Sequence, residues 1–212
     1  MFRRALAPVF ALFLLVGGAA HASALDLPRE PGAFVQELSR FAIEDILKAN
    51  IDSQERIKRF ETLLDEAFDM PFIARFVVGG AWKEASEAQR TEFQKLFRDM
   101  NVISWGTRFD EYGGQRIAVT NVQSQDARGG KLHEVTTSIG NEGDKAMLVI
   151  WVLRENPEQG NRLGVIDLKV EGVSMAQTFR GEYLAVLKNT GSMDGLNKVL
   201  KDKIAALRGS KT

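Results

Sequence analysis

The chain has 212 residues, of which 44% are hydrophobic and 26% charged, a composition that can bury a core. Its 28 basic and 28 acidic residues balance, and loss of Arg3 and Arg4 with an N-terminal leader would leave a net charge near −2, so neither nucleic acid nor an anionic membrane surface is indicated as a partner. Cysteine is absent and histidine occurs twice, which argues against disulfides, thiol chemistry and metal sites of the zinc and copper type. No metal and no cofactor are predicted.

The first 24 residues have the features of a secretory signal peptide. A pair of arginines precedes an apolar run over residues 5–20, and two overlapping A-x-A sites follow, ending at Ala22 and Ala24. The run is short for a membrane span, and a proline and a glycine pair interrupt it. The alternative to a cleaved signal peptide is a signal anchor that the protein retains. We therefore predict a signal peptide over 1–24, cleavage near Ala22 or Ala24, and one exported, soluble domain over 25–212.

The segment from Pro31 to about Phe109 is predicted to be helical throughout. Two capping boxes, Asp52 with Glu55 and Ser86 with Gln89, mark helix starts because each pairs a capping side chain with an acid or amide three residues later. Apolar residues recur at helical spacing and predict the buried faces. These stripes are Phe34, Val35, Leu38, Phe41, Ala42 and Ile46; Ile57, Phe60, Leu63, Leu64, Ala67 and Phe68; and Phe93, Leu96, Phe97, Met100 and Ile103.

From Gln115 onward the apolar period changes to two. Four strands are predicted, around residues 117–119, 132–139, 145–154 and 166–170, and short polar turns between them favour an antiparallel meander. Helices follow, the first opened by a box of Ser174 with Gln177. The fold class is therefore α+β, with an N-terminal helical part packed on a C-terminal antiparallel four-stranded sheet.

The third strand, KAMLVIWVLR, is apolar on both faces. Met147, Val149 and Trp151 alternate with Leu148 and Ile150, and an antiparallel sheet covered on one side only would show a polar face instead. Both faces are therefore expected to be covered. Helices can cover one face, and the other is covered either by more helix or by a hollow that holds an apolar molecule.

One stretch invites an enzymatic interpretation. Residues 172–176, GVSMA, lie between a strand and a helix and approach the G-x-S-x-G nucleophile elbow of hydrolases. A serine nucleophile needs a base, and in those enzymes the histidine follows the serine in the chain. No histidine follows Ser174, and the only one outside the leader is His133, so Ser174 is predicted to be a helix cap and no catalytic residue is assigned.

Several blocks together resemble a known family. They are FDMPFIARFVVGGAW (68–82), AQRTEFQKLF (88–97), YGGQRIAV (112–119), VIDLKVEGVSMAQTFRGEY (165–183) and GLNKVLKDKI (195–204). Each block is loose by itself, but their order and spacing over nearly the whole mature chain resemble the periplasmic phospholipid-binding MlaC/toluene-tolerance family. The resemblance implies a cystatin-like roll with a helical subdomain, a periplasmic location and no enzymatic activity.

The resemblance also implies a function. Similar proteins hold phospholipid acyl chains in an apolar cavity and shuttle lipid between an outer-membrane lipoprotein complex and an inner-membrane ABC transporter complex with a membrane-anchored lipid-binding subunit, a role tied to outer-membrane lipid asymmetry. We expect the cavity between the third strand and the N-terminal helices. Its expected walls are Val78, Trp82, Phe93, Phe97, Trp105, Ile117, Val119, Met147, Val149 and Trp151.

Other functions remain open at this point. The chain has Thr178-Phe179-Arg180 where the family commonly has Asn-Tyr-Arg, and Trp105 where a tyrosine is common, so a hopanoid or another lipid is an alternative ligand. Cystatin-like rolls also host small isomerases with an Asp or Glu base in an apolar pocket. A structural interaction protein is the third alternative. Co-purifying lipid would distinguish a carrier from the other two.

Overall fold

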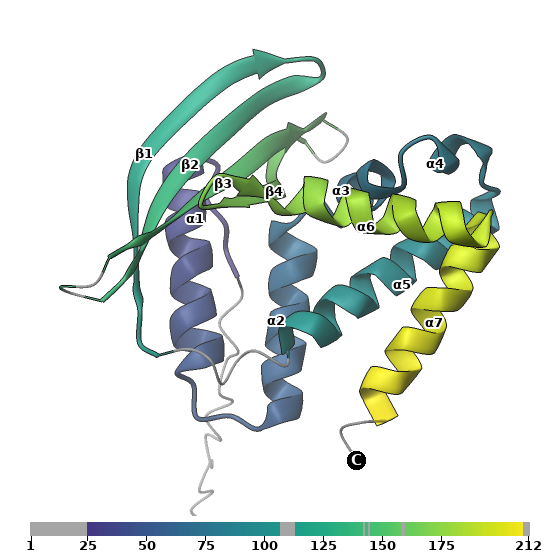
Figure 1. Cartoon of the computed structure of the whole chain (residues 1–212). Helices are drawn as coiled ribbons and strands as arrows, with labels where there is room; N and C mark the ends of the chain where they lie inside the picture. The colour runs from purple at the N-terminus through teal and green to yellow at the C-terminus, as the bar shows by residue number, and fades with distance from the viewer. Residues whose placement is uncertain (1–24, 107–112, 142, 144, 158–159, 210–212) are drawn as a thin grey trace, which may run out of the picture.

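The computed structural model describes residues 25–106, 113–141, 143, 145–157 and 160–209, and its architecture is α+β, as predicted (Figure 1). The signal peptide predicted over 1–24 lies outside the described residues. The helices are α1 (Pro31–Arg40), the π-helical segment η1 (Phe41–Leu47), α2 (Ser53–Ala67), α3 (Met70–Val78), α4 (Ala81–Glu84), α5 (Glu87–Gly106), α6 (Met175–Thr190) and α7 (Met193–Gly209). The strands are β1 (Arg116–Ala127), β2 (Gly130–Gly140), β3 (Met147–Asn156), β4 (Arg162–Val170) and β5 (Val173–Ser174).

Side chains at the helix starts explain where α2 and α5 begin. The Asp52 carboxylate accepts the backbone N–H of Glu55 at 2.8 Å. Ser86 and Gln89 cap each other, since the Gln89 N–H donates to Ser86 Oγ at 3.3 Å and the Ser86 N–H donates to Gln89 Oε1 at 2.8 Å. Each bond satisfies an N–H that has no partner inside the helix, so Asp52 and Ser86 are N-caps, as the sequence predicts.

The sheet is an antiparallel meander in the order β1-β2-β3-β4-β5. It has five strands where the sequence predicts four. The additional strand, β5, has two residues and pairs with Lys169 and Val170 after a turn at Glu171 and Gly172, whose φ angles are 48° and 82°. A two-residue strand has no measurable periodicity, so the alternation rule could not find it.

The sheet curls over α1 and α2, while α3 to α7 form a second, helical lobe beside it (Figure 1). One buried cluster joins α1, η1 and α2 to β2, β3 and β4, around residues such as Phe34 and Leu153. The other joins α3, α5, α6 and α7, around residues such as Phe93 and Leu196. Phe68, between α2 and α3, packs against both clusters and connects the two lobes.

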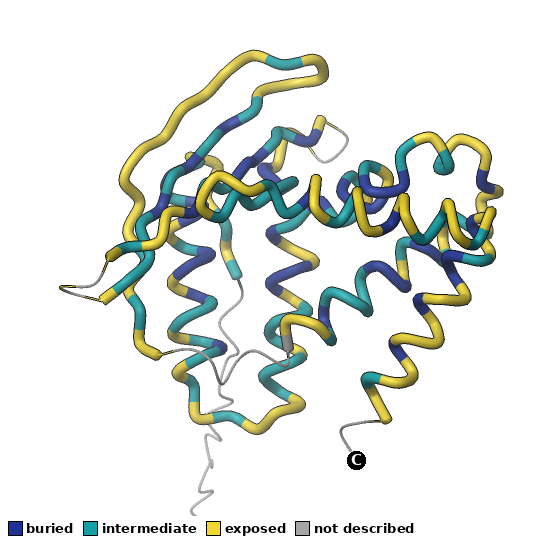
Figure 2. The backbone as a smooth tube through the Cα atoms, viewed as in Figure 1, coloured by how far each residue is buried: buried dark blue, intermediate teal, exposed yellow. Residues whose placement is uncertain are grey.

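The two faces of β3 are covered unequally. On the inner face Val149 is 4% exposed, and Leu153, in the cluster with α1, is fully buried. On the outer face Leu148 is 50% exposed. The expectation that both faces are covered is therefore wrong at Leu148, because the sheet curls over α1 and α2, so these helices lie on its concave side (Figure 1). The edge strand β1 is exposed over most of its length (Figure 2).

Within the described part of the chain, none of the helices combines the length and the apolar composition that a membrane crossing requires.

Candidate functional site

A cavity of about 520 Å³ lies where the sheet meets η1, α2, α5 and the start of α6. Its walls come from both lobes and are mostly apolar. The lining residues are Leu38, Ser39, Ala42, Ile46, Leu47, Phe60, Leu63, Leu64, Phe68, Met70, Ile73, Phe97, Asn101, Trp105, Ile117, Met147, Trp151, Ile166, Asp167, Leu168, Met175, Ala176 and Phe179. Drug-sized and larger ligands occupy apolar cavities of this volume, with a few polar groups to orient them.

The wall contributed by η1 has an unusual backbone. The N–H of Lys48 donates to the carbonyl of Ile43 at 2.9 Å, the i to i−5 spacing of a π-helix. Ala42, Ile46 and Leu47 of this segment line the cavity. Seven residues of π-helix are rare, and such segments occur most often at functional sites.

Trp151 presents its ring to the cavity and its polar edge to the sheet. Its indole N–H donates to Thr137 Oγ1 at 3.0 Å, and the Thr137 hydroxyl donates to the carbonyl of Val149 at 3.1 Å. The one polar atom of the indole is therefore satisfied inside the protein. The rest of the ring is free to serve as apolar wall.

Exposure along the walls locates the mouth of the cavity. Trp105 is 38% exposed and Met147 is 40% exposed, whereas Ile46 is 1% exposed and Leu64 is 5% exposed. The cavity therefore runs from a mouth beside Trp105 and Met147 to a closed end formed by η1 and α2.

Two of the polar lining residues are already engaged in the protein. Asn101 donates to the carbonyl of Phe97 at 2.8 Å. Asp167 accepts from Ser174 Oγ at 2.6 Å and from the backbone N–H of Ala176 at 2.8 Å, so both of its oxygens hold the start of α6. A carboxylate with both oxygens engaged in this way is a structural group rather than a general base that waits for a substrate proton.

Ser39 differs from the other polar lining residues. It is 5% exposed, and its hydroxyl has no hydrogen-bond partner among the described residues. A buried hydroxyl without a partner carries an energetic cost unless a ligand or water satisfies it. Ser39 is thus a wall residue whose buried hydroxyl has no partner among the described residues.

The structure brings five of the ten predicted wall residues into the lining of this cavity. They are Phe97, Trp105, Ile117, Met147 and Trp151. All five are large side chains that reach the space between the sheet and α5. Their contact with a ligand stays a prediction.

The other five predicted residues lie elsewhere. Val78 and Phe93 are fully buried in the helical lobe, and Trp82 packs against the same lobe with the Arg90 guanidinium 5.6 Å from its ring. Val119 is 36% exposed on the outermost strand. Val149 is buried in the sheet without lining the cavity.

Sequence reasoning missed most of the walls from α1 to α3 and from β4 to α6. Leu38, Ala42, Phe60, Leu63 and Phe68 belong to the predicted apolar stripes, but a stripe shows only that a side chain points inward. Whether the inward space is filled or hollow depends on how far the facing helix and sheet are apart. Periodicity contains no signal for that distance.

Ser174 is the N-cap of α6, as predicted. Its Oγ accepts the backbone N–H of Gln177 at 3.0 Å and donates to Asp167. His133 instead bonds Ser124, with Ser124 Oγ and His133 Nδ1 2.8 Å apart on adjacent strands. Neither Ser124 nor His133 lines the cavity, so this pair, which sequence reasoning missed, is a cross-strand contact.

Among the described residues, no group of three or more histidine, aspartate or glutamate side chains is placed to hold a metal ion. The described walls therefore consist of apolar surface, two polar side chains engaged within the protein, the Ser39 hydroxyl and a solvent-facing mouth. Such an arrangement can enclose an apolar molecule and leave a polar end at the surface.

Comparison with known proteins gives a family match and a structural match. A sequence model of a family described as "MlaC protein" matches residues 36–202. The fold is similar to a solved phospholipid-binding protein from Ralstonia solanacearum in complex with a phospholipid, with a TM-score of 0.69 and 16% identity over 84% of this chain and 98% of that one. A search of curated proteins found no match.

Proposed function

The chain belongs to the MlaC family, and from this premise we propose that it is a carrier that binds a phospholipid by its acyl chains in the 520 Å³ cavity. The observation that carries the proposal is the cavity itself, which is apolar along its length and opens to solvent at one end. The structural neighbour from Ralstonia solanacearum, which has the same fold, was solved with a phospholipid bound and supports the proposal.

The physical chemistry of the cavity suits acyl chains. Each buried methylene contributes about 0.8 kcal/mol, so two chains provide affinity without a charged clamp. A phospholipid entering chains first would leave its charged head at the mouth beside Trp105 and Met147, where no desolvation of the charge is needed.

Membership of the family supports a proposal for the route of the lipid. We propose that the mature protein shuttles phospholipid through the periplasm between an outer-membrane lipoprotein complex and an inner-membrane ABC transporter complex. The predicted leader over 1–24 supports export. Mass spectrometry of the exported protein tests this point: a chain starting at Ser23 or Leu25 is expected, and an intact leader would contradict it.

The central experiment is native mass spectrometry of protein purified without detergent. Wild type is expected to carry lipid, and the mass of the ligand distinguishes a glycerophospholipid from a hopanoid. Ala42→Trp adds bulk at a small residue of the cavity wall and is expected to lose the ligand. Wild-type protein without lipid would contradict the carrier function.

A matched variant separates filling of the cavity from general damage. Ala33→Trp introduces the same side chain at a partly exposed helical position of α1 that does not line the cavity. It is expected to keep the lipid. Thermal unfolding by circular dichroism checks both variants, since overpacking costs about 1–3 kcal/mol. If folded Ala42→Trp carries as much lipid as wild type, the ligand lies elsewhere.

A further inference from the structure

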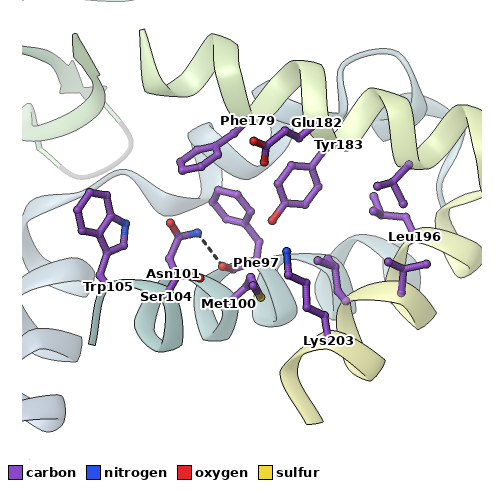
Figure 3. Close-up of a pocket in the computed structure, with 13 residues that line it drawn as sticks. Phe97, Met100, Asn101, Ser104, Trp105, Phe179, Glu182, Tyr183, Leu196 and Lys203 are labelled. Atoms are coloured by element: carbon purple, nitrogen blue, oxygen red, sulfur yellow. Dashed lines mark hydrogen bonds between the residues drawn. The ribbon is translucent and has the colours of Figure 1, made fainter. Parts of the chain in front are cut away.

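A second cavity, of about 240 Å³, lies within the helical lobe between α5, α6 and α7 (Figure 3). It shares Phe97, Asn101, Trp105 and Phe179 with the large cavity, so these side chains form a common wall. The remaining lining residues belong to this cavity alone, and none of them comes from the sheet. Its volume is less than half that of the large cavity, which suits one acyl chain where the large cavity suits two.

Two polar groups of this cavity point into it. Figure 3 shows the Tyr183 hydroxyl and the Lys203 side chain directed toward the space between the helices. Lys198 and Lys201, on the same helix, form ion pairs with carboxylates at 2.7 and 2.5 Å. The Lys203 ammonium group, in contrast, makes no ion pair or hydrogen bond with the described residues.

Tyr183 is held in place as a neutral donor. Its ring packs edge-on against Phe93 and Phe97, at 84° and 64°. Burial, with the nearby Glu182 carboxylate, raises the pKa of the Tyr183 phenol above its ordinary value of 10.0. The hydroxyl is therefore neutral at physiological pH and can donate a hydrogen bond to an anion.

We propose that this second cavity binds one single-chain amphiphile with an anionic head group. The chain lies between α5, α6 and α7 against Phe97, Phe179 and Val186, and the head lies at Lys203, with the Tyr183 hydroxyl as a second donor. The head is a carboxylate, as in a fatty acid, or the phosphate of a single-chain phospholipid. Its binding does not require the large cavity to hold lipid.

Decanoate is the first probe, because it has one chain and a small anionic head. Native mass spectrometry of the protein, with whatever lipid it carries, is expected to show one added decanoate while any co-purified lipid stays bound. Titration with fluorescence detection measures the affinity in a Trp82→Phe, Trp151→Phe protein. Its remaining tryptophan, Trp105, borders both cavities.

Matched variants place the chain. Val199→Phe fills the second cavity from α7, whereas Leu184→Phe adds the same side chain on α6 outside both cavities; each wild-type residue is 38% exposed. Val199→Phe is expected to abolish decanoate binding, and Leu184→Phe is expected to retain it. Decanoate that binds Val199→Phe as it binds wild type, or that displaces the co-purified lipid, would overturn the proposal, as would no binding at all.

A second pair of variants tests the head group. Lys203→Met should weaken decanoate about threefold, the modest effect of an exposed charge, and should leave the affinity for 1-decanol unchanged. Lys198→Met, at a lysine outside the cavity, should change neither affinity. Equal weakening of decanoate and decanol by Lys203→Met would refute a role for the charge.

A third experiment distinguishes a fatty acid from a single-chain phospholipid as the source of the anionic head group. Decanoyl lysophosphatidylethanolamine carries an ammonium group that Glu182, across the cavity, can attract. If the occupant is a single-chain phospholipid, Glu182→Gln should weaken the binding of this probe. If the occupant is a fatty acid, the wild-type protein should bind decanoate more tightly than it binds this probe. Retention of co-purified lipid without decanoate binding would leave the carrier function intact and refute the second site alone.

Discussion

Arg154 on β3 and Asp69 at the start of α3 join the two lobes: Arg154 Nε donates to Asp69 Oδ2 at 2.6 Å. The other Asp69 oxygen accepts the backbone N–H of Phe72 at 3.1 Å and so caps α3. The Arg154 guanidinium also lies 4.5 Å from the centre of the Phe72 ring. The Asp69 side chain is only 7% exposed, so a buried carboxylate fixes the position of the helical lobe on the sheet.

Replacing this carboxylate should destabilise the protein. Asp69→Ala removes a helix cap and leaves Arg154 without its partner, and we expect the free energy of unfolding to fall by about 2–4 kcal/mol. Urea denaturation measures the change. Glu66→Ala is the control, since its ion pair with Arg162 is 2.8 Å long but about half exposed, and its loss should cost less than about 1 kcal/mol. Equal losses in the two variants would contradict the role of Asp69.

Ser174→Ala should lose a cap and keep lipid binding. The hydroxyl accepts the N–H of Gln177 at the start of α6, and its removal should lower the free energy of unfolding by about 1 kcal/mol. Denaturation and native mass spectrometry of the same sample measure stability and bound lipid. A folded Ser174→Ala protein without any function would instead revive the hydrolase interpretation.

Val149→Trp, at a wall residue that the sequence predicts, should act differently from Ala42→Trp. Val149 is 4% exposed and lies in the sheet outside the cavity lining, so a large ring there must displace packed neighbours. We expect a loss of stability of about 1–3 kcal/mol, with lipid retained in the fraction that folds. Lipid loss without any change in the unfolding transition would show that Val149 faces the ligand.

Alkaline pH should destabilise the protein through Tyr183. Because burial raises the pKa of its phenol above 10.0, the unfolded chain loses this proton at lower pH than the folded chain does. The contribution of Tyr183 to the free energy of unfolding is therefore fully present below pH 10. Above pH 10 this contribution falls by up to about 1.4 kcal/mol per pH unit.

Tyr183→Phe isolates this contribution. The variant cannot ionise at that position, so its stability between pH 9 and 11 should decline less steeply than that of wild type. The remaining tyrosine, Tyr112, and all lysines are common to both proteins and cancel in the comparison. Parallel pH profiles in urea denaturation would contradict the predicted burial effect.

The sequence by itself determined the elements of this fold. Capping side chains such as Asp52, Ser86 and Ser174 act within three residues of the helix start, and the change from helical to alternating periodicity near Gln115 is equally local. The α+β class follows from these signals because each element must bury its apolar face. The two-residue strand β5 was beyond them, since it is too short to have a period.

Only the tertiary structure decided where the cavity lies and which side chains form it. Phe93 and Phe97 occupy the same predicted stripe, yet Phe93 is packed inside the helical lobe and Phe97 lines the cavity. An inward-facing side chain meets either a neighbour or a void, and the difference depends on the spacing between elements far apart in sequence. That spacing is set by long-range contacts such as Asp69 with Arg154, 85 residues away, which no local pattern encodes.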